Sequence, residues 1–152
     1  MRVNRYVLDA NVWVSYIITQ TQHKLLNPVA EGNIIIFTCD ELLVELRRVL
    51  LYPQLSKYKI DLPASIRFVR DISVNYQLNY PIKRYIIADP DDDYIVALAL
   101  QTNSGFITSG DRHILSEKAI LEAKFRRLKI LTKAEFEKKG NTVIGSKILL
   151  QR

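Results

Sequence analysis

Apolar residues along the chain alternate between short continuous runs and longer stretches in which they recur every three or four positions. The continuous runs indicate buried strands, and four of them lie at residues 5–8, 34–38, 106–109 and 128–131. The periodic stretches indicate helices that pack against a core by one face. Strands that alternate with helices in this way predict an α/β domain, a three-layer α/β/α sandwich with a mainly parallel central sheet.

Capping residues and helix breakers locate the ends of the predicted helices. We expect a first helix from a cap at Asn11 through Ile17, and a second from Gln22 to Gly32, in which Pro28 is a candidate break. The later helices are predicted to begin at Asp40, Asp61 with Pro63, Asp89 with Pro90, and Thr132 with its end at Gly140.

The length and composition indicate one globular domain. The chain has 152 residues and is 48% hydrophobic and 25% charged, and it contains no internal repeat or linker-like stretch. We expect residues 1–140 to form this domain. The tail over residues 141–152 carries several apolar residues after the core is complete, so it packs either on the domain or on a partner.

The distribution of charge is more informative than its total. The formal net charge is +6, from 22 basic and 16 acidic side chains. Residues 85–111 hold five acids and no base, whereas 47–84 hold eight bases and two acids, and 112–139 hold nine bases and four acids. Surplus Lys and Arg favour a polyanionic partner such as nucleic acid, and clustered carboxylates repel one unless metal ions intervene. Charge alone leaves open a merely solvated basic surface.

Cysteine usage and the absence of an apolar leader bear on the compartment. The single cysteine, Cys39, follows a strand-like run and is expected to be a buried, reduced side chain. Asp9 interrupts any signal-peptide core, and the uncharged run 10–22 is shorter than the roughly 20 apolar residues that a membrane span needs. We therefore expect a cytoplasmic protein with no membrane association.

Four carboxylates stand at positions that favour a shared site. In open α/β sheets, sites form at the carboxyl ends of the strands, and Asp9 and Asp111 follow two predicted strands. Glu45 lies about 40° from the apolar stripe of its predicted helix, which would leave it half buried. Asp92 projects among the inward residues of its helix, and its neighbours Asp91 and Asp93 point about 100° to either side.

Each of these acids also has a purely structural interpretation. Asp9 and Asp111 suit turns or caps, and Asp92 could join Asp89 in a helix-start cap. Glu45 could be a solvated residue paired with Arg48, three positions on. Taken together, however, four carboxylates at one sheet edge would repel strongly without cations. Oxygen ligands of this kind suit Mg²⁺ or Mn²⁺, and such ions activate water for phosphodiester hydrolysis.

With these positions in place, the chain resembles the PIN-domain ribonucleases, specifically the branch of toxins from toxin–antitoxin pairs, from about residue 3 to 137. The blocks that carry the resemblance are weak singly but specific in their order and spacing. They are Val7-Leu8-Asp9-Ala10-Asn11-Val12, Glu41-Leu42-Leu43-Val44-Glu45-Leu46, Asp89-Pro90-Asp91-Asp92-Asp93 with Ala97 and Ala99 downstream, and Thr108-Ser109-Gly110-Asp111.

The resemblance implies a metal site and a reaction. It places the acidic metal-binding and catalytic residues of the family at Asp9, Glu45, Asp92 and Asp111, with Asn11, Asp89, Ser109 and His113 at supporting positions. Ser109 stands where the family usually has Thr, and His113 replaces an acid that often follows the last Asp. An imidazole there can still bind Mn²⁺ or contact phosphate.

The implied reaction is hydrolysis of single-stranded RNA by water that Mg²⁺ or Mn²⁺ activates, with Glu45 as a ligand or general base. The resemblance also suggests a cognate antitoxin and a homodimer as partners.

Other function classes remain as alternatives. The first is a catalytically silent module of the same fold that binds RNA or protein; Tyr76, Tyr80 and Tyr85 could stack on bases or pack in the core. The second is a phosphatase of the haloacid-dehalogenase type, which Asn11 disfavours because that chemistry needs a carboxylic acid there. No Gly-rich phosphate loop follows a strand, and His23 and His113 lack partners at zinc spacing.

Overall fold

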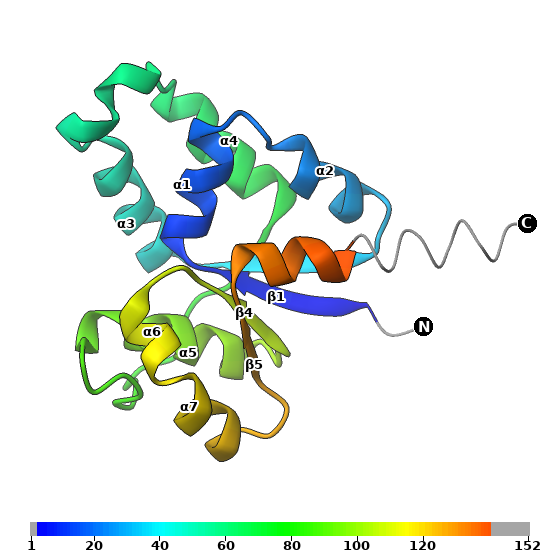
Figure 1. Ribbon diagram of the computed structural model, residues 1–152, viewed down its shortest axis with the longest axis vertical. Helices are drawn as coiled ribbons and strands as arrows, with labels where there is room; N and C mark the ends of the chain where they lie inside the picture. The colour runs from blue at the N-terminus through cyan, green and yellow to red at the C-terminus, as the bar shows by residue number, and fades with distance from the viewer. Residues whose placement is uncertain (1–2, 141–152) are drawn as a thin grey trace, which may run out of the picture.

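The computed structural model describes residues 3–140, which form a five-stranded sheet covered by helices on both faces (Figure 1). The strands are β1 Asn4–Leu8, β2 Ile34–Thr38, β3 Val74–Asn75, β4 Phe106–Thr108 and β5 Lys129–Leu131. All neighbouring pairs are parallel, in the order β3-β2-β1-β4-β5. The predicted α/β/α sandwich is therefore confirmed, and its sheet is wholly parallel.

The helices follow the predicted order along the chain. They are α1 Ala10–Ile18, α2 His23–Ala30, α3 Asp40–Leu50, α4 Leu62–Ile72, α5 Asp93–Gln101, α6 Arg112–Ser116, α7 Lys118–Lys124 and a last helix over residues 133–140, with 3₁₀ turns η1 Pro53–Tyr58 and η2 Pro90–Asp92. In Figure 1, α1 to α4 and the orange last helix lie on one side of the sheet, and α5, α6 and α7 lie on the other.

The sheet order explains this division of the helices. The helices that connect β1 to β2 and β2 to β3 lie on one face of the sheet. After β3 the chain crosses the sheet to form β4 on the other side of β1, and the helix in this connection lies on the opposite face. Strand β1 lies in the middle, and its Val7 and Leu8 are fully buried between the two helical layers. A strand buried on both faces reads as a continuous apolar run, as the sequence of β1 and β2 does.

Several predicted helix ends are confirmed. The Asp61 side chain caps α4 by accepting from the Ala64 N–H at 3.0 Å. Thr132 and Glu135 exchange side-chain to backbone hydrogen bonds of 3.2 and 2.9 Å, a reciprocal arrangement that starts the last helix. Gly32 takes φ +73° after α2, a conformation that glycine adopts without strain.

Other predicted ends are wrong by one or two residues. Asp9, and not Asn11, is the N-cap of α1, because the strand ends at Leu8 and the helix begins directly at Ala10. Asp40 is the first residue of α3 and not its cap; the preceding Cys39 takes that place without a side-chain hydrogen bond. Pro28 does not break α2, which continues to Ala30.

Some short elements have no counterpart in the prediction. Strand β3 has only two residues, and the helices α6 and α7 have five and seven, too few for a periodic pattern to identify. The tail over residues 141–152 lies outside the described residues.

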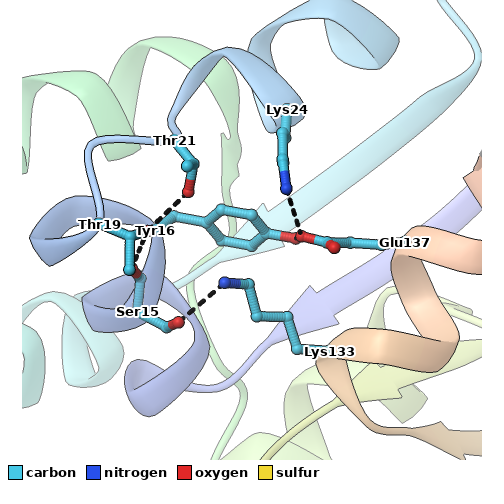
Figure 2. Close-up of polar contacts among 7 residues, drawn as sticks. All are labelled: Ser15, Tyr16, Thr19, Thr21, Lys24, Lys133 and Glu137. Carbon is cyan, nitrogen blue, oxygen red and sulfur yellow. Dashed lines mark hydrogen bonds and ion pairs between the residues drawn. The ribbon is translucent and has the colours of Figure 1, made fainter.

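The last helix is attached to α1 by polar contacts that Figure 2 shows. Tyr16 donates from its hydroxyl to Glu137 at 2.9 Å, and Lys24 lies 3.9 Å from the same carboxylate. Lys133 donates to Ser15 at 2.8 Å, and its ammonium lies 4.2 Å from the centre of the Tyr16 ring. Residues more than a hundred positions apart thus hold the two ends of the domain together.

Two further expectations concern burial. Cys39 is fully buried and free, as predicted. Among residues 3–140, no helix is both long and apolar enough to span a lipid bilayer.

Candidate functional site

The candidate site lies where the strand order reverses. Strands β1 and β4 are neighbours in the sheet, but the chain leaves them toward opposite edges, and sites of open α/β sheets form at the carboxyl ends of such strands. Asp9 follows β1 directly, and Asp111 follows β4 after Ser109 and Gly110. The Asp9 N–H donates to the Thr108 carbonyl at 2.9 Å, which extends the pairing of these strands to the edge of the site.

Asp9 is held from several directions. Its side chain is 2% exposed. One oxygen accepts from the Ala10 N–H at 2.8 Å, which caps α1. The other accepts from the Ser109 hydroxyl at 2.7 Å and from the Asn11 amide at 3.2 Å. The structural interpretation of Asp9 as a cap is thus correct, and the same carboxylate also faces the residues after β4.

Ser109 and Asn11 join the ends of β1 and β4. The Ser109 oxygen donates to Asp9 and accepts from the Asp111 N–H at 3.0 Å. The Asn11 carbonyl accepts from the Gly110 N–H at 2.9 Å. Both residues therefore hold the acids through hydrogen bonds, and they join the segment that carries Asp9 to the segment that carries Asp111.

Glu45 extends from α3 toward α5. It is half buried, as its place at the border of the apolar stripe predicted. Tyr94 of α5 donates a hydrogen bond to its carboxylate. The alternative pairing with Arg48 does not form, because Arg48 instead donates to the Tyr52 hydroxyl at 3.0 Å.

Asp92 is an acid whose side chain keeps an unpartnered oxygen. It is 6% exposed, and within residues 3–140 its buried Oδ2 meets no hydrogen-bond donor. Asp92 stands at the N-cap position of α5, but its side chain makes no capping hydrogen bond; Asp89 caps η2 by accepting from the Asp91 N–H at 3.0 Å. A buried oxygen without a donor is costly, so its retention calls for a ligand or a proton.

One expectation about this segment is wrong. Asp93 does not turn away from the interior but is as buried as Asp92. It accepts from the Tyr85 and Ile86 N–H groups at 2.9 and 2.7 Å and lies 3.3 Å from Arg84. The 100° step fails here because the chain changes from a 3₁₀ turn to an α-helix between the two residues.

The acids lie close enough together to raise the pKa values of Asp92 and Asp9. Burial raises the pKa of Asp92 to about 8, together with the neighbouring negative charges of Asp111, Asp9, Asp89 and Glu45. Burial also raises the pKa of Asp9 to about 6, against the opposing hydrogen bonds from Ser109 and Ala10. The candidate site therefore disfavours negative charge on Asp92 and Asp9.

Asp111 and His113 contact each other through a side chain and a main-chain group. Asp111 is partly buried and accepts from the His113 N–H at 2.7 Å, which caps α6. His113 thus orients Asp111 through its main chain, and its ring is half buried. Of the predicted tyrosines, Tyr76 and Tyr85 pack against the core, whereas Tyr80 is 64% exposed and donates to Glu41.

The carboxylates of the candidate site have the right chemistry for a divalent cation, but they do not converge on one point. The carboxylate oxygens suit Mg²⁺ or Mn²⁺, and the unpartnered Asp92 oxygen and raised pKa values are what a cation would relieve. Among residues 3–140, however, no three His, Cys, Asp or Glu side chains are arranged to hold one ion. Glu45, Asp9 and Asp111 already accept hydrogen bonds from Tyr94, Ser109 and a main-chain N–H, respectively. The donor chemistry of the site fits a divalent cation.

Tyr94 is a site residue that the sequence did not indicate. It contacts Glu45 across 49 positions of the chain, and no local pattern connects a tyrosine in α5 with an acid in α3. Its place two residues after Asp92 is the one feature that sets it apart in the sequence.

Comparison with solved structures agrees with this fold. The solved structure of VapBC2 from Rickettsia felis, bound to a DNA fragment from its promoter, contains a chain that superposes with a TM-score of 0.51. The two are 12% identical, and the match covers 84% of this chain and 98% of the other. No curated protein matches the chain.

The family comparison covers most of the chain. The model of the PIN domain matches residues 5–113, a range that runs from β1 through the start of α6 and contains Asp9, Glu45, Asp92 and Asp111. This chain therefore belongs to the PIN domain family.

Proposed function

We propose that this protein is a metal-dependent endoribonuclease that cleaves single-stranded RNA, and that it acts as the toxin of a toxin–antitoxin pair. The observation that carries the proposal is the environment of Asp92: a buried carboxylate with an unpartnered oxygen, next to three other acids at the switch point of a parallel sheet. Such a cluster is costly for stability alone and useful for binding a cation at a phosphate.

Family membership supports the reaction class. PIN domains are generally nucleases and typically use divalent metal ions. A bound Mg²⁺ or Mn²⁺ lowers the pKa of water and stabilises negative charge on phosphate oxygens. In this chain, Asp9, Asp92 and Asp111 would hold the ion. Glu45 would be a further ligand or would accept the proton of the attacking water, with its carboxylate oriented by Tyr94.

The role of the supporting residues follows from their contacts. Ser109 and Asn11 keep Asp9 and Asp111 in place by joining the residues that follow β1 to those that follow β4. Because a carboxylate has about four lone-pair sites, the hydrogen bonds already made to Asp9 and Asp111 leave acceptor capacity for a cation. The neighbouring solved structure is a VapBC complex, which supports an antitoxin as partner. We also propose a homodimer in the cytoplasm, where its RNA substrate would be.

The test is cleavage of mixed RNAs by the purified protein with Mg²⁺ or Mn²⁺ and with chelator. Asp92→Asn should lose cleavage by two or more orders of magnitude while remaining folded. Asp91→Asn is the matched control, because it removes the same charge from an adjacent, exposed position and should retain activity.

Equal cleavage by Asp92→Asn and the parent protein would mean that the site is assigned wrongly. Absence of any cleavage of RNA by the antitoxin-free parent would favour the catalytically silent module on the same fold. Cleavage that persists in chelator would exclude the metal-dependent reaction.

A further inference from the structure

A basic and aromatic surface begins beside Glu45 and continues along α3 into η1. We name it the α3 ridge and define it by Arg48, Tyr52, Lys57 and Tyr58. All four side chains are exposed, with Tyr52 and Tyr58 at 39% and 40%. In Figure 1 the segment after α3 lies at the outer end of that helix, at the upper left. The ridge therefore begins about one helical turn after Glu45 and extends beyond the end of α3.

The register of α3 places Arg48 near Glu45. Arg48 is three positions after Glu45, so the two lie about 60° apart on a helix of 3.6 residues per turn and about 4.5 Å apart along its axis. The helix ends at Leu50, so Tyr52 lies beyond it, and the hydrogen bond of 3.0 Å from Arg48 to the Tyr52 hydroxyl places Tyr52 next along this surface. A chain that enters the site beside Glu45 therefore meets Arg48 and then Tyr52.

Each tyrosine of the ridge is paired with a cation. The Arg48 guanidinium lies 5.9 Å from the centre of the Tyr52 ring and donates to its hydroxyl at 3.0 Å. The Lys57 ammonium lies 5.3 Å from the centre of the Tyr58 ring. These contacts hold each positive charge beside a partly exposed aromatic ring, which is the combination that binds single-stranded nucleic acid.

The positive charge of this surface is not neutralised by the protein. Residues 46–60 contain four bases, Arg47, Arg48, Lys57 and Lys59, and no acid. Within residues 3–140, none of these four forms an ion pair with a carboxylate. A patch of unpaired cations next to a carboxylate cluster suits a nucleic-acid strand. The phosphates along the strand would contact the cations, and the phosphate to be cleaved would lie at the acids.

We propose that the α3 ridge binds the single-stranded RNA on one side of the cleavage position, with Tyr52 and Tyr58 stacked on bases and Arg48 and Lys57 paired with phosphates. The identification of this strand as a substrate rests on the proposed function. Stacking tolerates any base, so the ridge contributes affinity and substrate length rather than sequence selection.

Fluorescence anisotropy with a labelled oligouridylate, in chelator and at low salt, measures this binding without cleavage. Tyr52→Leu and Tyr58→Leu should each weaken binding about tenfold. Tyr52→Phe should bind like the parent, because the ring remains. Arg48→Gln and Lys57→Gln should weaken binding and reduce the salt slope by about 0.7 for each phosphate that the protein no longer neutralises.

Arg126→Gln is the matched control for loss of charge. Arg126 is exposed and precedes β5, at the amino-end edge of the sheet and thus opposite the site. Its substitution should leave binding unchanged. Equal weakening by Arg126→Gln and Arg48→Gln would show that only net charge matters, and it would overturn the proposal. Failure of the parent to bind the oligouridylate would overturn it too and would favour an acidic protein partner for this surface.

The binding experiment and the cleavage experiment test the ridge proposal and the nuclease proposal independently. If ridge variants lose binding but no RNA is cut with Mn²⁺, the ridge stands and the nuclease proposal fails. If RNA is cut with Mn²⁺ and ridge variants keep the binding and the KM of the parent, the nuclease proposal stands and the ridge proposal is wrong.

Discussion

The hydroxyl of Ser109 donates to Asp9 across 2.7 Å, although 100 positions of the chain separate the two residues. The same oxygen accepts from the Asp111 N–H at 3.0 Å, so one small side chain positions the acids that follow both central strands. Its hydrogen bond also lowers the pKa of Asp9, against the effect of burial. This contact links the fold to the proposed chemistry more directly than any other.

We expect Ser109→Ala to impair both activity and stability. Loss of the hydroxyl leaves an Asp9 oxygen and the Asp111 N–H with one partner fewer, at a cost of about 1–3 kcal/mol in the free energy of unfolding. Because the lost hydrogen bond lowers the pKa of Asp9, that pKa should rise above about 6. The acid limb of the pH–rate profile for RNA cleavage should then move to higher pH. Ser109→Thr retains the hydroxyl and should leave the limb in place; an unmoved limb in Ser109→Ala would contradict this role.

The metal-free protein should become less stable as the pH rises. The folded-state pKa values of Asp92 and Asp9, about 8 and about 6, lie above the value of about 4 that an unfolded chain gives. The folded state therefore binds more protons than the unfolded state between pH values of about 4 and 8, and stability falls across this window. Urea unfolding in chelator should show that the free energy of unfolding falls as the pH rises. In Asp92→Asn this free energy should depend less on pH. A steeper fall in that variant would contradict the assignment of the raised pKa.

Divalent metal should restore stability at the alkaline end of this window. A cation that binds only the folded state stabilises it by about 2.7 kcal/mol at a concentration roughly one hundred times its dissociation constant. Urea unfolding at pH about 8 with Mn²⁺ should show this gain for the parent and for Asp91→Asn, whereas Asp92→Asn should lose most of it. An equal gain in all three proteins would place the metal elsewhere.

Tyr94→Phe should uncouple Glu45 from α5. The substitution removes the hydroxyl that donates to the half-buried carboxylate, and we expect a loss of about 1–3 kcal/mol in the free energy of unfolding. A double-mutant cycle with Glu45→Gln should give a coupling energy of about 1 kcal/mol or more. If the two substitutions are additive, the hydrogen bond contributes nothing. Cleavage should slow in Tyr94→Phe because Glu45 is no longer oriented.

Tyr16→Phe should destabilise the domain without changing its proposed activity. The hydroxyl of the fully buried Tyr16 donates to Glu137 and attaches the last helix to α1 (Figure 2). Loss of this charge-assisted bond should cost about 1.5–3 kcal/mol. Because Tyr16 lies about two turns beyond the Asp9 cap, kcat for RNA cleavage should stay within a factor of about two. Glu137→Gln retains an acceptor and should cost less than Tyr16→Phe.

The sequence by itself determined the fold class, the order of the major elements and the positions of the candidate acids. Periodicity and strand ends report which residues face inward and which follow a strand, and these features are local. They placed Asp9 and Asp111 at strand ends and Glu45 at the border of a buried face, and the structure agrees. The same local rule failed at Asp93, where a 3₁₀ turn interrupts the helical step.

Only the tertiary structure decided which of these residues meet. The strand order brings β1 beside β4, and this neighbourhood creates the contact of Ser109 with Asp9, while the packing of α3 near α5 creates that of Tyr94 with Glu45. Burial and repulsion among the acids, which raise the pKa of Asp92, likewise arise from packing. The physical reason is that a hydrophobic pattern specifies the face of an element but not its partner, and partners are set by how the faces pack together.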